Sequence, residues 1–224
     1  MIKLENFEVL GWEHAIRGMR NPMNSWNKSD SYGVTTQAIE EGWFDIGPND
    51  HNLMMKLANA GPVHGKFRRM ITVYVDITAP LYWWKEFDTY KVGTVANSCS
   101  TMHKIHEKEF TLDDFSHEHL IGDWNGDHKE AVYYWDRDDN NGPRMLFASP
   151  VDGLKVIVGL LNSNREAFLK TKDKSYWWQM IQLLPSSYNQ KRTVQLNYEV
   201  LANIYEYRKN HKLDEWVEFC EWVE

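Results

Sequence analysis

The sequence has little of what disulfide-rich, membrane-spanning or nucleic-acid-binding proteins require. It contains only two cysteines, Cys99 and Cys220, among 224 residues, too few for a disulfide framework or a four-cysteine metal site. No stretch approaches the roughly 18 apolar residues of a membrane helix, and the first residues lack the apolar run of a signal peptide. The net charge of −7 argues against binding to nucleic-acid polymers. We therefore expect a cytoplasmic protein that binds neither membranes nor nucleic-acid polymers.

Aromatic residues, by contrast, are abundant. They make up 14% of the chain and include eleven tryptophans. Such rings usually fill a hydrophobic core, but they also line pockets for flat ligands. The length suits one domain with a substantial core. We expect a single domain over residues 1–224, with a polar insertion at about 111–150 where Gly, Asp and Asn cluster.

Hydrophobic periodicity predicts more helix than strand, which is an α/β pattern in the broad sense (α+β). We expect strands at 2–10 and 67–80, and helices at 12–20, 35–41, 50–60, 81–92, 155–171, 176–184, 193–207 and 213–223. Asp50 is the expected N-cap of the helix at 50–60. Pro80 is expected in the first turn of the helix that follows it.

Histidines and one cysteine are the first candidates for chemistry. His103, His106, His117 and His119 include HxxH and HxH spacings, which can place two imidazoles on one face. No cysteine or spaced carboxylate completes the set, so we predict no metal site. Cys99 lies four residues before His103, and a nucleophilic thiol needs such a base nearby. One pair at that spacing arises easily by chance.

Two basic segments are the other candidates. The segment GPVHGKFRR at 61–69 is not a Walker loop, and it fits a turn into an edge strand as well as a phosphate-contacting turn. Nearer the C-terminus, Lys191 and Arg192 precede a predicted helix in which Asn197 and Arg208 lie on nearly one face. Arginine suits planar bidentate contacts. For Arg208 taken alone, a surface salt bridge is the commoner role.

Taken together, the segments at 79–103 and 184–216 resemble the flavin-dependent thymidylate synthases. In that family a strand enters Ala-Pro, a helix follows with Arg-Gln, and then comes the signature Arg-His-Arg-x-x-Ser-x-Asn-Glu-x-Ser-x-Arg-Tyr. The matching positions here are Ala79-Pro80, Lys85-Glu86 and Thr89-Tyr90-Lys91, followed after one extra residue by Asn97, Ser100, Met102 and His103. The segment AIRGMR near the N-terminus resembles the family's Ala-Val-Arg-x-x-Arg helix.

The C-terminal part of the resemblance rests on spacing. The interval from Leu184-Pro185 to Asn197 matches the family's Leu-Pro-to-Asn spacing without a gap. Lys191 then occupies the position of a substrate-binding Arg, and Arg208 that of the Arg that binds and polarises the pyrimidine. Glu215-Trp216 approximates the family's Gln-Trp.

The resemblance implies a flavin-dependent thymidylate synthase-like fold, a small antiparallel sheet packed with several helices, over most of the chain except 111–150. It implies a homotetramer with active sites at the subunit interfaces, which methylates dUMP to dTMP with FAD, NADPH and methylene tetrahydrofolate. Arg208 would be catalytic. The implied substrate-binding residues are Lys191, Arg192, Lys85, Glu86 and Ser100. The implied FAD-binding residues are His64, Lys91, Asn97 and Asn197.

Departures from the signature leave two other hypotheses open. Thr89, Tyr90 and Met102 replace residues that grip the phosphates of FAD and dUMP, and none of them supplies a bidentate guanidinium. One alternative is a non-catalytic nucleotide- or flavin-binding protein on the same fold, as phages and mobile elements would use. The other is a purely structural or partner-binding oligomer. Trp83 and Trp84 cannot both point to one helix face, so we expect one in the core and the other facing a subunit or a ring.

Overall fold

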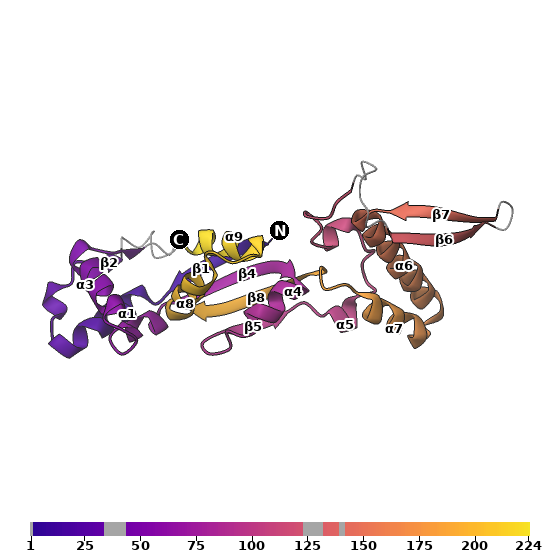
Figure 1. Cartoon of the computed structure of the whole chain (residues 1–224). Coiled ribbons are helices and arrows are strands. Elements are labelled where there is room, and N and C mark those ends of the chain that lie inside the picture. The colour runs from indigo at the N-terminus through magenta and orange to yellow at the C-terminus, as the bar shows by residue number, and fades with distance from the viewer. Residues whose placement is uncertain (1, 34–43, 123–131, 139–141) are drawn as a thin grey trace. The chain divides into compact units, whose positions relative to one another are not determined.

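The structure, a computed structural model, describes residues 2–33, 44–122, 132–138 and 142–224 (Figure 1). These residues form two compact units. The sheet unit comprises residues 2–79, 83–99 and 191–224, and the helical unit comprises residues 80–82 and 100–190. The expected single domain with an insertion at 111–150 stays a prediction.

A four-stranded sheet, in the order β1-β4-β8-β5, organises the sheet unit. Its strands are β1 (Lys3–Leu10), β4 (Thr72–Pro80), β5 (Val95–Ser98) and β8 (Asn189–Asn197). β1 runs antiparallel to β4, with Lys3 opposite Thr78, and β5 runs antiparallel to β8, with Val95 opposite Gln195. The predicted combination of helices with a small antiparallel sheet is therefore confirmed.

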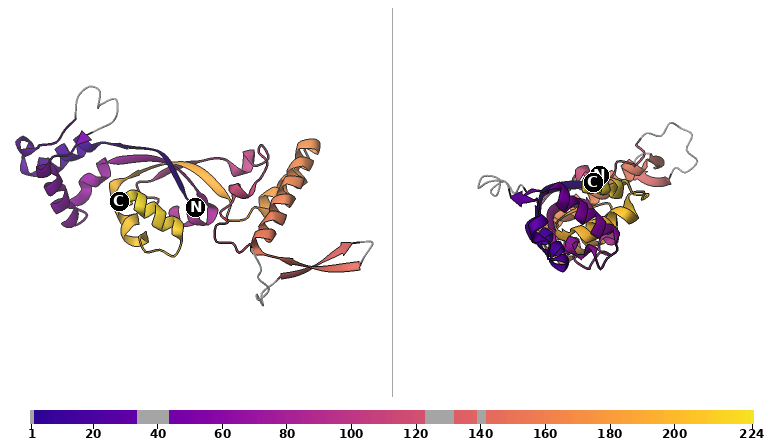
Figure 2. Two further views of the ribbon diagram at one scale, coloured as in Figure 1. Left: turned by 90° about the horizontal axis from the view of Figure 1, so that it is seen from above. Right: turned by 90° about the vertical axis from the view of Figure 1, so that its left-hand side faces the viewer.

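One face of the four-stranded sheet is buried and the other is exposed. Val73, Val75 and Ile77 of β4 are buried, whereas the alternate residue Tyr74 is 40% exposed. Because successive side chains of a strand point to opposite faces, one face is covered and the other is open. The two C-terminal helices, drawn in yellow, lie on one side of the strands (Figure 2).

Helices and short strands complete the sheet unit. They are α1 (Trp12–Arg20), η1 (Asn21–Met23), η2 (Trp26–Lys28), β2 (Tyr32–Gly33), β3 (Phe44–Asp45), α3 (Pro48–Asn59), η3 (Gly65–Met70), α4 (Leu81–Phe87), α8 (Tyr198–Arg208) and α9 (Asp214–Val223). Gly11 joins β1 to α1 with φ +95°, and a Cβ there would lie 2.2 Å from the carbonyl oxygen of Met70. This junction therefore requires glycine.

Tryptophans from two helices form the aromatic core of the sheet unit. Trp83, Trp84 and Trp216 are each 0% exposed. The ring centroids of Trp83 and Trp84 lie 4.9 Å apart, and those of Trp83 and Trp216 lie 4.6 Å apart. The expectation that one of the adjacent tryptophans would face a subunit or a ligand ring is therefore wrong. Both are buried because α4 is covered on more than one side.

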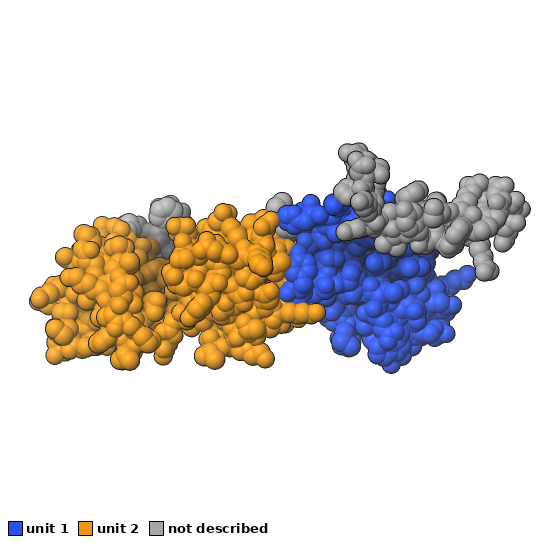
Figure 3. Space-filling model, viewed as in Figure 1, with its two compact units in different colours: residues 1, 80–82, 100–190 blue, residues 2–79, 83–99, 191–224 orange. Residues whose placement is uncertain are grey.

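The helical unit, blue in Figure 3, has its own hydrophobic core. Its elements are α5 (Thr101–Lys104), η4 (Leu112–Asp114), β6 (Val132–Asp138), β7 (Gly142–Ala148), α6 (Pro150–Thr171) and α7 (Lys174–Leu183). The core residues are Ile105, Phe110, Phe115, Leu154, Leu161 and Met180. α6 begins with a capping box between Ser149 and Asp152, and Pro150 occupies its first turn, as the N-terminal preferences of helices favour.

Several predicted boundaries are wrong. The strand expected at 67–80 begins at Thr72, because the residues before it form the 3-10 helix η3. The helix expected at 193–207 is β8 followed directly by α8. Strand β5 was not predicted. The N-cap of α3 is Gly47 and not Asp50. The helix expected at 35–41 lies outside the described residues.

Candidate functional site

Arg208, the last residue of α8, lies among four side chains that together with it form the Arg208 cluster: Glu86, Tyr90, His211 and Trp216. Its Nε donates a hydrogen bond to the hydroxyl of Tyr90 at 2.9 Å, and its Nη1 donates to Oε2 of Glu86 at 2.5 Å. The guanidinium carbon lies 4.8 Å from the ring centroid of Trp216. The indole Nε1 of Trp216 donates to the same Glu86 oxygen at 3.1 Å.

The cluster leaves one edge of Arg208 available to a ligand. The side chains of Arg208 and Glu86 are 19% and 35% exposed, so the pair is partly shielded from water. Nη1 also lies 2.9 Å from Nε2 of His211. Nη2 has no hydrogen-bond partner among the residues that the structure describes. That amino group is able to donate two hydrogen bonds to acceptor oxygens.

Arg192 lies on the covered face of β8, beside α4. Its Nη1 lies 2.7 Å from Oδ1 of Asp88, and its guanidinium carbon lies 4.1 Å from the ring centroid of the buried Trp84. A guanidinium over an indole face makes a cation–π contact. Arg192 thus pairs its charge with a carboxylate while it packs against the aromatic core.

Lys191 precedes Arg192 directly and points to the open face of the sheet. Its Nζ lies 3.1 Å from Oδ2 of Asp76 and 3.5 Å from Oε2 of Glu5. Hydrogen bonds from Thr193, Asn6 and Lys191 lower the pKa of Asp76 to about 2. The hydrogen bond to Asp76 in turn raises the pKa of Lys191. Within this chain the strand therefore separates Lys191 from the Arg208 cluster.

Asn197, predicted to contact FAD, caps α8. Its Oδ1 accepts hydrogen bonds from the backbone N–H groups of Glu199 and Val200, both at 3.1 Å. Its Nδ2 lies against Gly93, where an added Cβ would be only 2.7 Å away. These contacts fix the Asn197 side chain at the start of the helix that carries Arg208.

Ser100, predicted to bind substrate, caps a different helix. Its Oγ accepts a hydrogen bond from the backbone N–H of His103 at 3.0 Å, at the start of α5. Ser100 belongs to the helical unit, whereas Arg208 belongs to the sheet unit. The nucleotide-binding role of Ser100 stays a prediction.

The remaining predicted residues lie on the surface of the sheet unit. Lys85, Lys91, His64 and Asn97 are all exposed. No hydrogen bond or ion pair within the described ranges joins any of them to the Arg208 cluster. Of the ten predicted site residues, the structure therefore brings together only Arg208 and Glu86 in direct contact.

Sequence reasoning missed three partners of Arg208, namely Tyr90, His211 and Trp216. The resemblance aligns Tyr90 and Trp216 with residues of the family's motifs, but it implies no binding or catalytic role for either of them. The informative signal was the acid at position 86, since the family pattern has glutamine there and a carboxylate beside an arginine favours an ion pair.

The histidines considered as metal ligands do not gather into a site. Within the described part of the chain, no three His, Cys, Asp or Glu side chains are grouped as metal ligands. The ring of His106 packs edge-to-face on Phe168, with centroids 4.9 Å apart. Nδ1 of His117 lies 2.8 Å from the carbonyl oxygen of Phe115. None of the described helices is long and apolar enough to cross a membrane.

The fold is that of the flavin-dependent thymidylate synthases. Thymidylate synthase X from Helicobacter pylori, crystallised with FAD and dUMP, matches with a TM-score of 0.62 over 99% of this chain and 90% of its own, at 14% identity. A second structure of that enzyme with FAD and dUMP matches with a TM-score of 0.58 over 98% and 90%, also at 14% identity. At 14% identity, this structural likeness is evidence for the fold alone.

A weaker structural match is a nucleotide methylase. The UMP/dUMP methylase PolB from Streptomyces cacaoi, bound with 5-bromo-UMP, matches with a TM-score of 0.49 over 90% of this chain and 74% of its own, at 12% identity. At the level of sequence, the chain matches no protein-family profile and no curated protein.

Proposed function

We propose that the protein binds a pyrimidine nucleoside or nucleotide at the Arg208 cluster without carrying out FAD-dependent methyl transfer. The observation that carries this proposal is the contact between Arg208 and Glu86, with 2.5 Å between Nη1 and Oε2. An arginine whose charge is already matched by a carboxylate is a weak phosphate ligand, but it remains a good hydrogen-bond donor.

The charge balance around the cluster supports binding without the flavin reaction. Arg192 is paired with Asp88, and Lys191 is paired with Asp76 and Glu5. FAD and dUMP together carry several phosphate charges, which need cations that are not already matched. Lys85 and Lys91 have no ion pair within the described ranges, but both are exposed and neither forms a hydrogen bond or ion pair with the Arg208 cluster, so they do not supply the missing charge there.

The donors of the cluster suit a pyrimidine ring. Nη2 of Arg208 is available to donate, and the Tyr90 hydroxyl accepts from Nε of Arg208, so its own proton is free for a ligand. Uracil and thymine present two carbonyl oxygens that accept such hydrogen bonds. A ligand bound through these donors would be recognised by its base more than by its phosphate.

A second candidate, the FAD-dependent methylation of dUMP, is favoured by one observation. The side chain of Arg208 is 19% exposed, so a substrate is able to reach it, and the sequence resemblance assigns Arg208 to the position of the family's pyrimidine-polarising arginine. In this candidate the protein is a homotetramer, and Lys191 on the open sheet face completes the site of another subunit. The flavin would supply the redox chemistry of the transferred carbon, while Arg208 would orient the pyrimidine.

Two measurements distinguish the candidates. The visible spectrum of the protein is recorded after incubation with FAD and removal of the excess, and calorimetry measures binding of deoxyuridine and dUMP to the protein without flavin. We expect no retained flavin band and similar affinities for the two ligands. A retained band with dUMP-dependent NADPH oxidation would establish the synthase instead.

Two variants test the role of Arg208 in this binding. Arg208→Ala should abolish deoxyuridine binding, while Arg17→Ala, which changes an exposed arginine of α1, should leave it unchanged. Equal affinities for all three proteins, with folding verified by circular dichroism, would refute the proposed site.

A further inference from the structure

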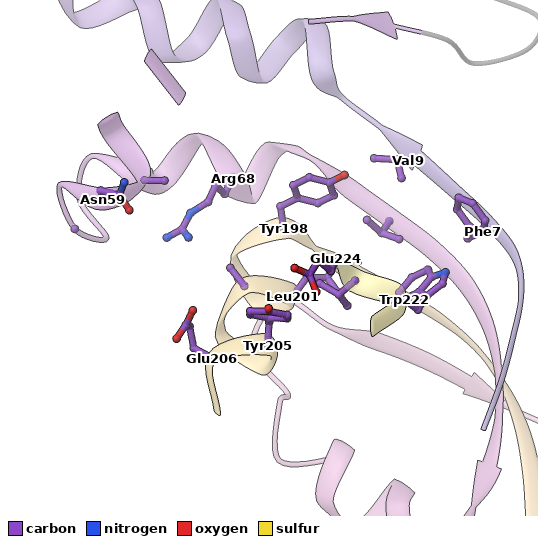
Figure 4. Close-up of a pocket in the computed structure, with 15 residues that line it drawn as sticks. Phe7, Val9, Asn59, Arg68, Tyr198, Leu201, Tyr205, Glu206, Trp222 and Glu224 are labelled. Carbon is purple, nitrogen blue, oxygen red and sulfur yellow. The ribbon is translucent and has the colours of Figure 1, made fainter. Parts of the chain in front are cut away.

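A second site candidate lies in the sheet unit, in a cavity of about 1050 Å³ between β1, the end of α3, α8 and α9 (Figure 4). None of the five residues of the Arg208 cluster is among the described residues that line it. Its volume is at the upper end of the range for small-molecule pockets, roughly 300–1,000 Å³. The cavity is therefore a separate place at which a ligand could bind.

One end of the cavity is aromatic and apolar. Phe7 and Trp222 line it, with ring centroids 5.9 Å apart in an edge-to-face arrangement. Phe7 is 63% exposed, so much of its ring surface is in contact with water. Tyr198 and Tyr205 lie between this end and the opposite one (Figure 4). A flat apolar ligand would remove these ring surfaces from water.

The other end carries Arg68, whose position is fixed by its own turn. Its Nε donates to the carbonyl oxygen of Gly65 at 3.2 Å, and a Cβ at Gly65 would lie 3.1 Å from its Nη2. Nη1 and Nη2 have no hydrogen-bond or ion-pair partner in the part of the chain that the structure describes. The next residue, Arg69, is by contrast paired with Glu199 at 2.5 Å.

No acidic side chain in the described part of the chain forms an ion pair with Arg68. Glu206 also lines the cavity, but its carboxylate lies 3.1 Å from Nζ of Lys209. Glu224 lines the cavity as well. Arg68 therefore presents two nitrogens in a fork geometry, which is the arrangement that binds carboxylate and related anions in a bidentate way.

We propose that this cavity binds a planar aromatic molecule that carries one acidic group. The ring system occupies the end formed by Phe7 and Trp222, and the acidic group is held by the Nη1 and Nη2 atoms of Arg68. Glu206 and Glu224 disfavour ligands with a second negative charge near the first. This site is independent of the function proposed for the Arg208 cluster.

The test uses two fluorescent probes with the same kind of aromatic body. 1-Anilinonaphthalene-8-sulfonate carries one negative charge, and N-phenyl-1-naphthylamine carries none. Both are titrated into the native full chain, and the dissociation constants are taken from the rise in emission. We expect saturable binding of both, with the sulfonate bound more tightly because Arg68 pairs with it.

Matched variants then distinguish the contribution of the Arg68 charge from that of the shape of the cavity. Arg68→Gln should weaken sulfonate binding about tenfold, as the loss of a charged hydrogen-bond donor predicts, and should leave the neutral probe unchanged. Arg69→Gln should change neither. Ala202→Phe, which adds a ring inside the cavity, should weaken both. Arg68→Lys keeps the charge without the fork and should give an intermediate loss.

Three outcomes would overturn the proposal. They are non-saturable binding of both probes, equal weakening by Arg68→Gln and Arg69→Gln, and unchanged binding in Ala202→Phe. Circular dichroism and thermal unfolding of each variant show whether it is folded. If Arg68→Gln does not fold, Arg68→Lys and Ala202→Phe decide the question.

Discussion

Arg208 and Glu86 form an ion pair, with 2.5 Å between Nη1 and Oε2, at positions that the sequence resemblance aligns with Arg and Gln of the flavin-dependent thymidylate synthases. A glutamine leaves the full charge of the arginine available to a substrate, whereas a glutamate cancels it. Two structures of the Helicobacter pylori enzyme share the fold of this chain.

Glu86→Gln should strengthen dUMP binding about tenfold, because removal of a carboxylate in contact with Arg208 exposes one positive charge to the phosphate. The glutamine keeps an oxygen that accepts from Nε1 of Trp216, so the fold should be retained. Calorimetry with dUMP measures the effect, and deoxyuridine should show a smaller one. Glu107→Gln, in the exposed pair with Lys104, is the control. Unchanged dUMP affinity in Glu86→Gln would show that this carboxylate does not limit anion binding.

Asp50 is a fully buried carboxylate that Arg20 and a turn satisfy. It accepts from Nε of Arg20 at 2.5 Å, and its other oxygen accepts from Ser29, Asp30 and Ser31. Burial alone would raise its pKa, but hydrogen bonds from Ser29, Ser31 and Arg20 outweigh this effect and hold the pKa at about 2, below the ordinary 3.8.

Lowering the pH should therefore reduce the stability of the sheet unit over the pH range set by the folded and unfolded pKa values of Asp50. Since the folded pKa lies below the unfolded one, the contribution of Asp50 is complete above about pH 4 and is lost as the pH falls towards 2, by about 2 kcal/mol. Asp50→Asn should flatten the pH dependence there. At neutral pH it should cost about 3 kcal/mol, because Arg20 is left buried and unpaired. Denaturant titrations at several pH values measure both effects, and Asp173→Asn at the N-cap of α7 should be nearly neutral.

Asn197→Ala should lower the free energy of unfolding by about 1 kcal/mol, because α8 loses the acceptor for two backbone N–H groups. Asn197→Asp should retain most of that stability, since aspartate is an equally good N-cap. Urea denaturation followed by tryptophan fluorescence measures both variants. Similar losses in the two would mean that the cap is not the structural role of Asn197.

Two glycine substitutions should act in opposite directions. Gly11→Ala should destabilise the protein by several kcal/mol, because φ is +95° and the new Cβ would lie 2.2 Å from the carbonyl oxygen of Met70. Gly159→Ala, in the exposed middle of α6 with nothing within 4 Å of the new Cβ, should stabilise it by up to about 1 kcal/mol. Thermal unfolding of both variants checks the signs.

Sequence patterns predicted β1, α1 and α9 to within a residue or so, because each has one clear hydrophobic period. They failed at β8 and α8. There, Val194 and Leu196 alternate as in a strand, whereas Val200 and Ile204 are spaced as in a helix, and no glycine or proline separates them. A single polar residue, Asn197, marks the change, which is too weak a signal to locate without the structure.

The candidate site was predictable only in part. Arg208 was predicted from the resemblance, as the Arg that ends the helix led by Asn197, but its partner Glu86 lies 122 positions away in the chain and was assigned to the substrate instead. Lys191 and Arg192 were both predicted to bind substrate, Lys191 because the resemblance puts it at the position of a substrate-binding Arg. Once they are placed in a strand, the alternation of side chains sends them to opposite faces.

The same alternation of side chains also helps to fix the register of β8 in the sheet. Lys191 matches Asp76 on one side of the sheet, and Arg192 matches Asp88 and Trp84 on the other. A slip of one position would bring Lys191 under the aromatic core and turn Val194 out to water, while both carboxylates lost their partners. The two neighbouring charges thus favour a single register of β8, the one in which both ion pairs form.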